Sequence, residues 1–128
     1  MTLPKDQEWH WTEGNKYAIE GMKTLLLLNG GSALALLAFF GNTAKTGSNG
    51  ILIAQSAGNA LLTFGLGALA TGFVFIFAYL TQLQYGNGDR PKATFWHNAT
   101  YVTVALGIIL FVSGILFART AIILSLTK

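Results

Sequence analysis

Two histidines lie next to tryptophans in the sequence, and their side chains could take part in redox chemistry. In EWHWTE, His10 lies between Trp9 and Trp11, and in TFWHN, His97 follows Trp96. Two histidines that face each other across one membrane interface could ligate a haem, with the tryptophans packed on its macrocycle. Membrane haem ligands normally lie deeper in a helix bundle. An interfacial belt of amphipathic side chains is therefore the favoured interpretation, and no cofactor is expected.

Other kinds of catalytic chemistry find little support in the residue types. The chain has no cysteine, which removes thiolate nucleophiles, disulfides and iron–sulfur clusters. A serine hydrolase needs a base beside its serine, and the only histidines are the two described above. Proton-coupled transporters usually keep an ionisable side chain inside the bilayer, and the long apolar stretches contain none. We therefore expect no catalytic or metal-binding residues and no enzymatic activity.

Four polar side chains within the apolar stretches remain as candidates for binding or packing. They are Asn29, Gln55, Asn59 and Thr63. The last three recur every fourth residue, which places them on one face of a helix. That stripe could form hydrogen bonds to the first crossing or line a polar lumen in an oligomer. Asn29 is expected to bond across a helix contact, with a ligand or ion role as the alternative.

The distribution of charge indicates the elements that must position these residues. Of the 128 residues, 52% are apolar and 10% are charged, against about 25% charged in a typical soluble domain. Charge-free stretches separate Lys23 from Lys45, Lys45 from Asp89, and Lys92 from Arg119. Each can hold a helix of about 20 residues, the length that crosses a bilayer. The sequence predicts an all-α integral membrane protein whose first partner is the lipid bilayer.

Three membrane-crossing helices are expected, at residues 24–41, 51–85 and 93–126. The second is longer than the hydrocarbon core is thick and must tilt or protrude. Residues 1–23 form a polar segment that, drawn as a helix, puts Glu13, Lys16, Glu20 and Lys23 on one face. We predict an interfacial amphipathic helix here, with a polar extension of the first crossing as the alternative.

The string GNGDRPK, from Gly86 to Lys92, predicts a tight turn between the second and third crossings. Gly86 is expected to be the left-handed cap of the second helix, because glycine adopts that conformation without steric cost. Pro91 suits the first turn of the third helix. The two crossings then form a long antiparallel hairpin.

The second and third crossings each carry a row of small residues with a period of seven. The rows are Gly58, Gly65 and Gly72 in the second, and Thr100, Gly107, Gly114 and Ala121 in the third. A period of seven keeps each row on one stripe, and helices in lipid pack closely through small residues. The predicted hairpin register places Gly72 against Gly107, Gly65 against Gly114, Gly58 against Ala121, and Tyr79 against Thr100.

The first crossing carries a similar stripe, formed by Gly31, Ala35 and Ala38. It explains the Asn-Gly-Gly inside an apolar helix as a surface for close contact rather than a helix break, with Asn29 bonding across it. The partner in that contact is the hairpin or another copy of the chain. We predict a homo-oligomer or a larger membrane complex, with the first crossing near the contact.

Orientation follows from the Lys and Arg residues that flank the crossings. One side holds Lys5, Lys16, Lys23, Arg90 and Lys92, and the other holds Lys45, Arg119 and Lys128. Because cytoplasmic flanks carry more Lys and Arg, the N-terminus is predicted to be cytoplasmic. The small net charge of +3 is split among these flanks, so nucleic acid is not expected as a partner.

Two strings, LLLLNGGSALALLAFFGN and AYLTQLQYGN, resemble those of small, uncharacterised bacterial inner-membrane proteins. The resemblance implies a multi-pass inner-membrane protein and assigns no activity to any residue. Size and helix count also resemble some phage holins, but RTAIILSLTK lacks their strongly charged tail. Two functions remain. One is a non-catalytic membrane subunit that self-associates or acts as an accessory or scaffold; the other is a pore-forming or membrane-perturbing protein, holin-like or for host defence. The first is preferred because nothing in the helices is polar enough to demand water.

Overall fold

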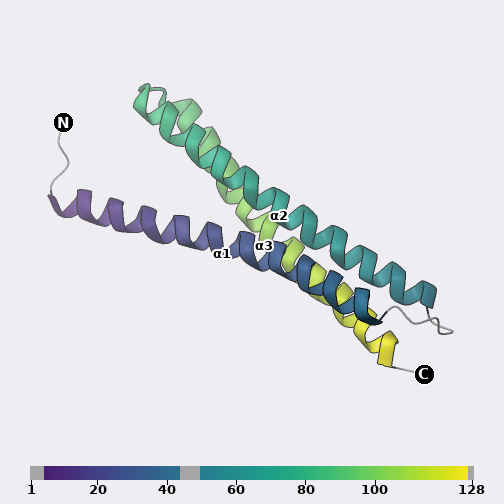
Figure 1. Ribbon diagram of the computed structural model, residues 1–128. Helices are drawn as coiled ribbons and strands as arrows, with labels where there is room; N and C mark the ends of the chain where they lie inside the picture. The colour runs from purple at the N-terminus through teal and green to yellow at the C-terminus, as the bar shows by residue number, and fades with distance from the viewer. Residues whose placement is uncertain (1–4, 44–49, 127–128) are drawn as a thin grey trace.

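The computed structural model describes residues 5–43 and 50–126, with the backbone alone for residues 5–8, 10, 11, 42 and 43. These residues form three helices, namely α1 (Lys5–Thr43), α2 (Gly50–Gly86) and α3 (Arg90–Leu126). The helices run alternately up and down in one elongated bundle, and the start of α1 and the end of α3 lie at opposite ends of it (Figure 1). The predicted all-α fold is confirmed.

All three helices are long and apolar enough to cross a membrane. Their outer faces expose many large hydrophobic side chains, for example Leu62, Leu69 and Ile109. Such a surface is typical of contact with lipid rather than with water. Threonine hydroxyls in the helices donate to the carbonyl oxygen one turn earlier, as Thr81 does to Phe77 at 2.8 Å, so they need no outside partner. The chain is a small multi-pass integral membrane protein.

The N-terminal polar segment and the first crossing are a single helix. α1 continues without a break from Lys5 to Thr43, over 39 residues. For the described residues the polar segment is therefore a helical extension of the crossing and not a separate helix, whereas its position at the membrane interface stays a prediction. Exposed ion pairs lie along the extension, one joining Lys16 to Glu13 at 2.6 Å and one joining Lys23 to Glu20 at 2.8 Å. Such pairs stabilise an exposed helix by only about 0.3–0.5 kcal/mol each.

The turn between α2 and α3 ends one helix and begins the next within three residues. Gly88 has φ of 76° and its N–H donates to Tyr85, while the N–H of Asp89 donates to Gln84. These two bonds form a Schellman motif whose left-handed position is Gly88. The prediction that Gly86 takes this role is therefore wrong, because α2 continues through Gly86.

Asp89 then begins α3 as its N-cap. Its Oδ1 accepts a hydrogen bond from the Lys92 N–H at 3.1 Å, which satisfies a free donor of the first turn. The Lys92 side chain, hydrogen-bonded to the same carboxylate, holds the pKa of Asp89 below its usual value. The cap therefore stays ionised at neutral pH. Pro91 lies in the first turn of α3, as predicted.

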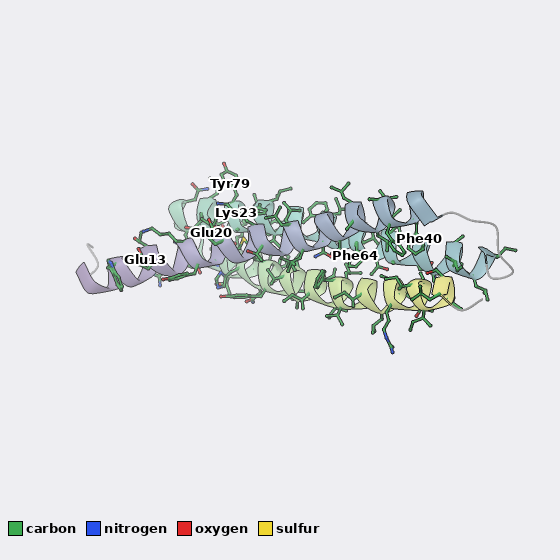
Figure 2. All side chains as sticks on the ribbon, turned by 60° about the horizontal axis from the view of Figure 1, so that its bottom comes forward. Glu13, Glu20, Lys23, Phe40, Phe64 and Tyr79 are labelled. Atoms are coloured by element: carbon green, nitrogen blue, oxygen red, sulfur yellow. The ribbon has the colours of Figure 1, made fainter. Side chains whose placement is uncertain are left out.

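α2 and α3 pack along their whole length, but not in the predicted register. In α3 the predicted row is buried, namely Thr100, Gly107, Gly114 and Ala121. In α2 the predicted row faces outward: Gly58 and Gly65 are exposed, and a Cβ built on Gly58, Gly65 or Gly72 would meet nothing within 4 Å. Tyr79 is exposed and points away from the other helices, so it does not face Thr100 (Figure 2).

The residues of α2 that face the α3 row are one position earlier in the chain. A Cβ on Gly114 would lie 2.6 Å from the ring of Phe64, and a Cβ on Gly107 would lie 3.3 Å from Oγ1 of Thr71. The ring of Phe64 thus occupies the space beside Gly114, and the side chains of Thr71 and Leu25 occupy the space beside Gly107. This arrangement buries more apolar area than two glycine rows in contact would, which is the physical reason for the observed register.

The first helix packs mainly on α2. Leu36 of α1 joins Ala60 and Phe64 of α2 in a small core, against which Phe40 and Phe111 also pack. Figure 2 shows Phe64 between the helices, and Phe40 towards the C-terminal end of α1. Towards its N-terminal end α1 leaves the hairpin and extends away from the turn (Figure 1). The tightest three-helix contact therefore lies in the C-terminal half of α1.

Candidate functional site at the three-helix junction

Asn29 is the polar side chain at which all three helices meet. It is fully buried, with 0% of its surface exposed. Its Nδ2 donates to the carbonyl oxygen of Leu25 at 3.0 Å within α1, and to that of Gly107 in α3 at 3.5 Å. The predicted bond across a helix contact is therefore present. Such bonds in membranes stabilise by about 0.6 kcal/mol on average, so the longer bond contributes modestly.

Glycines on both helices of the hairpin make room for this amide. A Cβ on Gly67 of α2 would overlap the Oδ1 of Asn29 and lie 2.6 Å from its Cγ. A Cβ on Gly107 would lie 3.0 Å from Cδ2 of Leu25, the residue one turn before Asn29. Glycine at position 67 thus makes the room for the Asn29 amide, and an added Cβ at position 107 would require the Leu25 side chain to shift slightly. Gly67 was not singled out from the sequence, because the buried seven-residue row to which it belongs, Ala60, Gly67, Val74 and Thr81, mixes small and larger residues.

One atom of the junction has no conventional hydrogen-bond partner. Oδ1 of Asn29 is buried and accepts no hydrogen bond from the described residues. Because a Cβ on Gly67 would overlap Oδ1, the Gly67 Cα–H that takes that direction points at the oxygen. Contacts of the Cα–H···O type recur at helix–helix interfaces and stabilise by about 0.5–1 kcal/mol. The glycine thus supplies both space and a weak donor.

The junction can join helices, and its described polar side chains do not ionise near neutral pH. Besides Asn29, its buried polar side chain is Thr71, whose hydroxyl donates to the carbonyl oxygen of Gly67 at 2.8 Å. A neutral amide and a neutral hydroxyl can orient backbone groups but cannot exchange protons near neutral pH. The geometry therefore fits the structural role that was expected for Asn29.

The small-residue stripe of α1 does not take part in this junction. Gly31, Ala35 and Ala38 are exposed, and a Cβ on Gly31 would meet nothing within 4 Å. Residues two positions apart on a helix point in different directions, so Gly31 cannot face the hairpin when Asn29 does. The expectation that Asn29 bonds across the contact made by this stripe is wrong. The stripe itself remains open on the outside of α1.

The predicted polar stripe of α2 is also on the outside. Gln55 and Asn59 are exposed, and Thr63 is half-buried, with its hydroxyl donating to the carbonyl oxygen of Asn59 at 2.6 Å. The interpretation in which this stripe bonds to α1 is therefore wrong. The side chains that α2 turns towards its neighbours are Ala60, Phe64 and Thr71 instead.

The histidine and tryptophan strings lie at the end of the bundle that holds the α2–α3 turn. Trp96 packs on Phe77 with ring centroids 5.4 Å apart, and His97 meets Tyr101 edge to face at 4.7 Å. Trp9 is exposed. The side chains of His10 and Trp11 lie outside the described residues, so the haem interpretation stays untested. Within residues whose side chains are described, no three His, Asp or Glu gather as a metal site would require.

Comparisons with protein-family models, with curated proteins and with solved structures find no match to this chain.

Proposed function

We propose that the chain is a non-catalytic membrane subunit that self-associates through the outer face of α2. One observation carries the proposal: a Cβ built on Gly58, Gly65 or Gly72 would meet nothing within 4 Å in the described chain. Each glycine inside a helix costs about 1 kcal/mol of helix propensity relative to alanine. When a second helix packs closely on a stripe of three glycines, the contacts it makes offset that cost.

Two polar side chains on the exposed side of α2 support the same surface. Gln55 and Asn59 are exposed near the end of α2 where that helix begins. A carboxamide that faces lipid leaves its donors and acceptors unpaired, which is unfavourable in an apolar medium. Against another copy of α2 the amides could pair with each other. Contact between two copies would therefore satisfy both the glycine row and the amides.

The alternative function, a pore, is supported only by the two exposed amide side chains of α2. Exposed Gln55 and Asn59 could face a lumen if several copies formed a ring. The rest of the exposed face of α2 is apolar, as Leu62, Leu69 and Ile76 show. A continuous wet channel needs polar groups along its length, so a packed contact between copies is better supported than a lumen.

Substitution of the glycine row tests self-association. Gly65→Leu places a bulky side chain on the proposed contact while raising helix propensity. We expect a particle of smaller mass in detergent or nanodiscs, with unchanged helix content, as measured by light scattering and circular dichroism. Gly41→Leu is the matched control, because Gly41 is exposed on α1 and a Cβ there would also meet nothing within 4 Å.

A strictly monomeric wild-type particle at the protein concentrations of a membrane would contradict the proposal. An oligomer of unchanged mass in the Gly65→Leu variant would show that the contact lies elsewhere, and the open stripe of α1 with Gly31 would be the next surface. Ion conductance of the reconstituted wild type that Asn59→Leu abolishes would favour the pore.

We also propose that the chain lies in a bacterial inner membrane with its N-terminus in the cytoplasm. Support comes from the excess of Lys and Arg on the side that holds the α2–α3 turn. Asn87 is exposed in that turn, so the Asn87→Cys variant should react with an impermeant thiol reagent only after the membrane is opened. Labelling of intact cells would invert the orientation.

A further inference from the structure

A groove opens between the N-terminal half of α1 and the hairpin, where the three helices diverge. Its deep part has a volume of about 510 Å³ and its outer part, nearer the α2–α3 turn, about 320 Å³. The two parts share wall residues, among them Met22 of α1 and Thr100 of α3, so they form one continuous groove. We refer to it as the α1 groove.

The lining of the α1 groove changes from apolar to polar along its length. The deep part is walled by hydrophobic side chains such as Leu25, Val104 and Ile108. The outer part is walled by groups that can donate hydrogen bonds, namely Asn15, Gln82, Tyr85 and His97. The polar end lies at the level of Trp96 and the turn, where aromatic side chains mark a membrane interface. The groove thus has the polarity profile of one lipid leaflet.

Small residues along α1 keep the α1 groove open. Gly21 and Ala18 line its deep part, and Gly14 lines its outer part. A Cβ on Gly14 or on Gly21 would meet nothing within 4 Å. Side chains of ordinary size at these positions would fill the space, and their absence leaves apolar walls without partner atoms. An empty apolar space loses dispersion contacts, so a filled groove is more stable than an empty one.

We propose that the α1 groove binds one glycerophospholipid, with an acyl chain in the deep part and the phosphate at Gln82 and His97. The groove has the volume of a small-molecule site, and it opens sideways, so a chain enters without leaving the hydrocarbon layer. Among the residues whose side chains the structure describes, no carboxylate lines the outer part of the groove. The nearby Glu13, Glu20 and Asp89 are each paired with a lysine, which leaves their charges compensated.

Arg90 adds a positive charge on the same side. It is exposed and lies seven residues before His97 in α3, nearly two helical turns, which places both on one face of the helix. A phosphate at the outer end of the groove therefore has hydrogen-bond donors beside it and a cation further towards the turn. This arrangement favours an anionic headgroup over a zwitterionic one.

Photo-crosslinking in vesicles tests the lipid site. The full chain is reconstituted in phosphatidylglycerol and phosphatidylethanolamine vesicles that carry a phospholipid with a photoreactive acyl chain. We expect labelling concentrated on groove walls such as Val104 and Ile108, as read by peptide mass spectrometry. Ala18→Trp should lower the labelling of these residues about tenfold, whereas Leu27→Trp, on an exposed position of the same helix, should leave it unchanged.

A second variant covers the case in which Ala18→Trp does not fold, and a change of headgroup tests the phosphate end of the site. Gly21→Leu fills the same space with a smaller side chain and should give the same loss if Ala18→Trp fails to fold. Labelling should fall when phosphatidylcholine replaces phosphatidylglycerol, and this dependence should disappear in the Gln82→Ala, His97→Ala double variant. Equal labelling of the groove and of exposed Ile109, or full labelling of the filled variants, would overturn the proposal. These readouts do not depend on self-association, because the α2 contact and the groove involve different residues.

Discussion

Two rows of small residues with the same period differ in burial: one packs inside the bundle and the other lies on its outer surface. The row of α3 is buried, with Gly114 under the ring of Phe64 and Gly107 against Thr71 and Leu25. The row of α2, which includes Gly65, faces outward. The comparison shows that a period of seven identifies a coherent stripe but does not say which neighbour covers it. What covers the stripe depends on the larger side chains beside it.

The largest expected effect distinguishes the two rows by their cost to the fold. Gly114→Leu forces a side chain into the ring of Phe64, and overpacking of this kind costs about 1–3 kcal/mol or more of the free energy of unfolding. In the dissociated monomer, Gly65→Leu should cost nothing and gain helix propensity. Thermal unfolding of both variants in the same detergent checks the difference. Equal destabilisation would mean that the two rows are equally buried.

A double-mutant cycle tests the junction that locks α1 to the hairpin. Gly67→Ala should destabilise the wild type, because the new Cβ overlaps the amide of Asn29. In the Asn29→Ala background that clash is absent and the added methyl group fills part of the vacated space. We expect a coupling free energy of about 1–2 kcal/mol between the two positions, from denaturant or thermal unfolding.

Gly72 provides the matched control for this cycle. A Cβ there would meet nothing within 4 Å, so Gly72→Ala and Asn29→Ala should be additive. Coupling at Gly72 as large as that at Gly67 would place the α2 row, and not Gly67, beneath Asn29.

The number of helices could be predicted, because the apolar and charged residues along each stretch of sequence indicate whether that stretch can cross a membrane. The charge-free gaps that follow Lys23, Lys45 and Lys92 predicted three helices, although α1 also extends through the charged residues before Lys23. The inward face of α3 was also predictable, since its row has no bulky member. These features depend on one helix at a time, which a sequence describes well.

The register and the junction could not be predicted, because they depend on how side chains of different size fit together. Phe64 gains more buried area over Gly114 than a second glycine would, and this preference shifts α2 by one residue. Gly67 belongs to a row of mixed residue sizes, and its importance becomes visible only when Asn29 is placed beside it. A buried amide that needs space on a neighbouring helix was the one clue available in the sequence.

A smaller effect is expected at the turn, where the predicted and observed caps differ by two residues. Gly88→Ala should cost about 1–2 kcal/mol, because a left-handed conformation is strained for any residue with a Cβ. Gly86→Ala should be neutral or stabilising, since Gly86 is the last residue of α2 and a Cβ there would meet nothing. Thermal unfolding measures the stability of both variants. A larger loss of stability in Gly86→Ala than in Gly88→Ala would show that Gly86 is the cap.

Disulfide trapping tests the register of the hairpin most directly, because the chain has no cysteine of its own. The double variant T71C/G107C joins positions whose side chains approach each other, since a Cβ on Gly107 would lie 3.3 Å from Oγ1 of Thr71. It should form an intrachain disulfide rapidly on mild oxidation, as measured by the loss of free thiols in the intact mass. G72C/G107C, the pair expected from the glycine rows alone, should remain reduced within the chain. Preferential oxidation of G72C/G107C would contradict the register, and with it the outward position of the α2 glycine row.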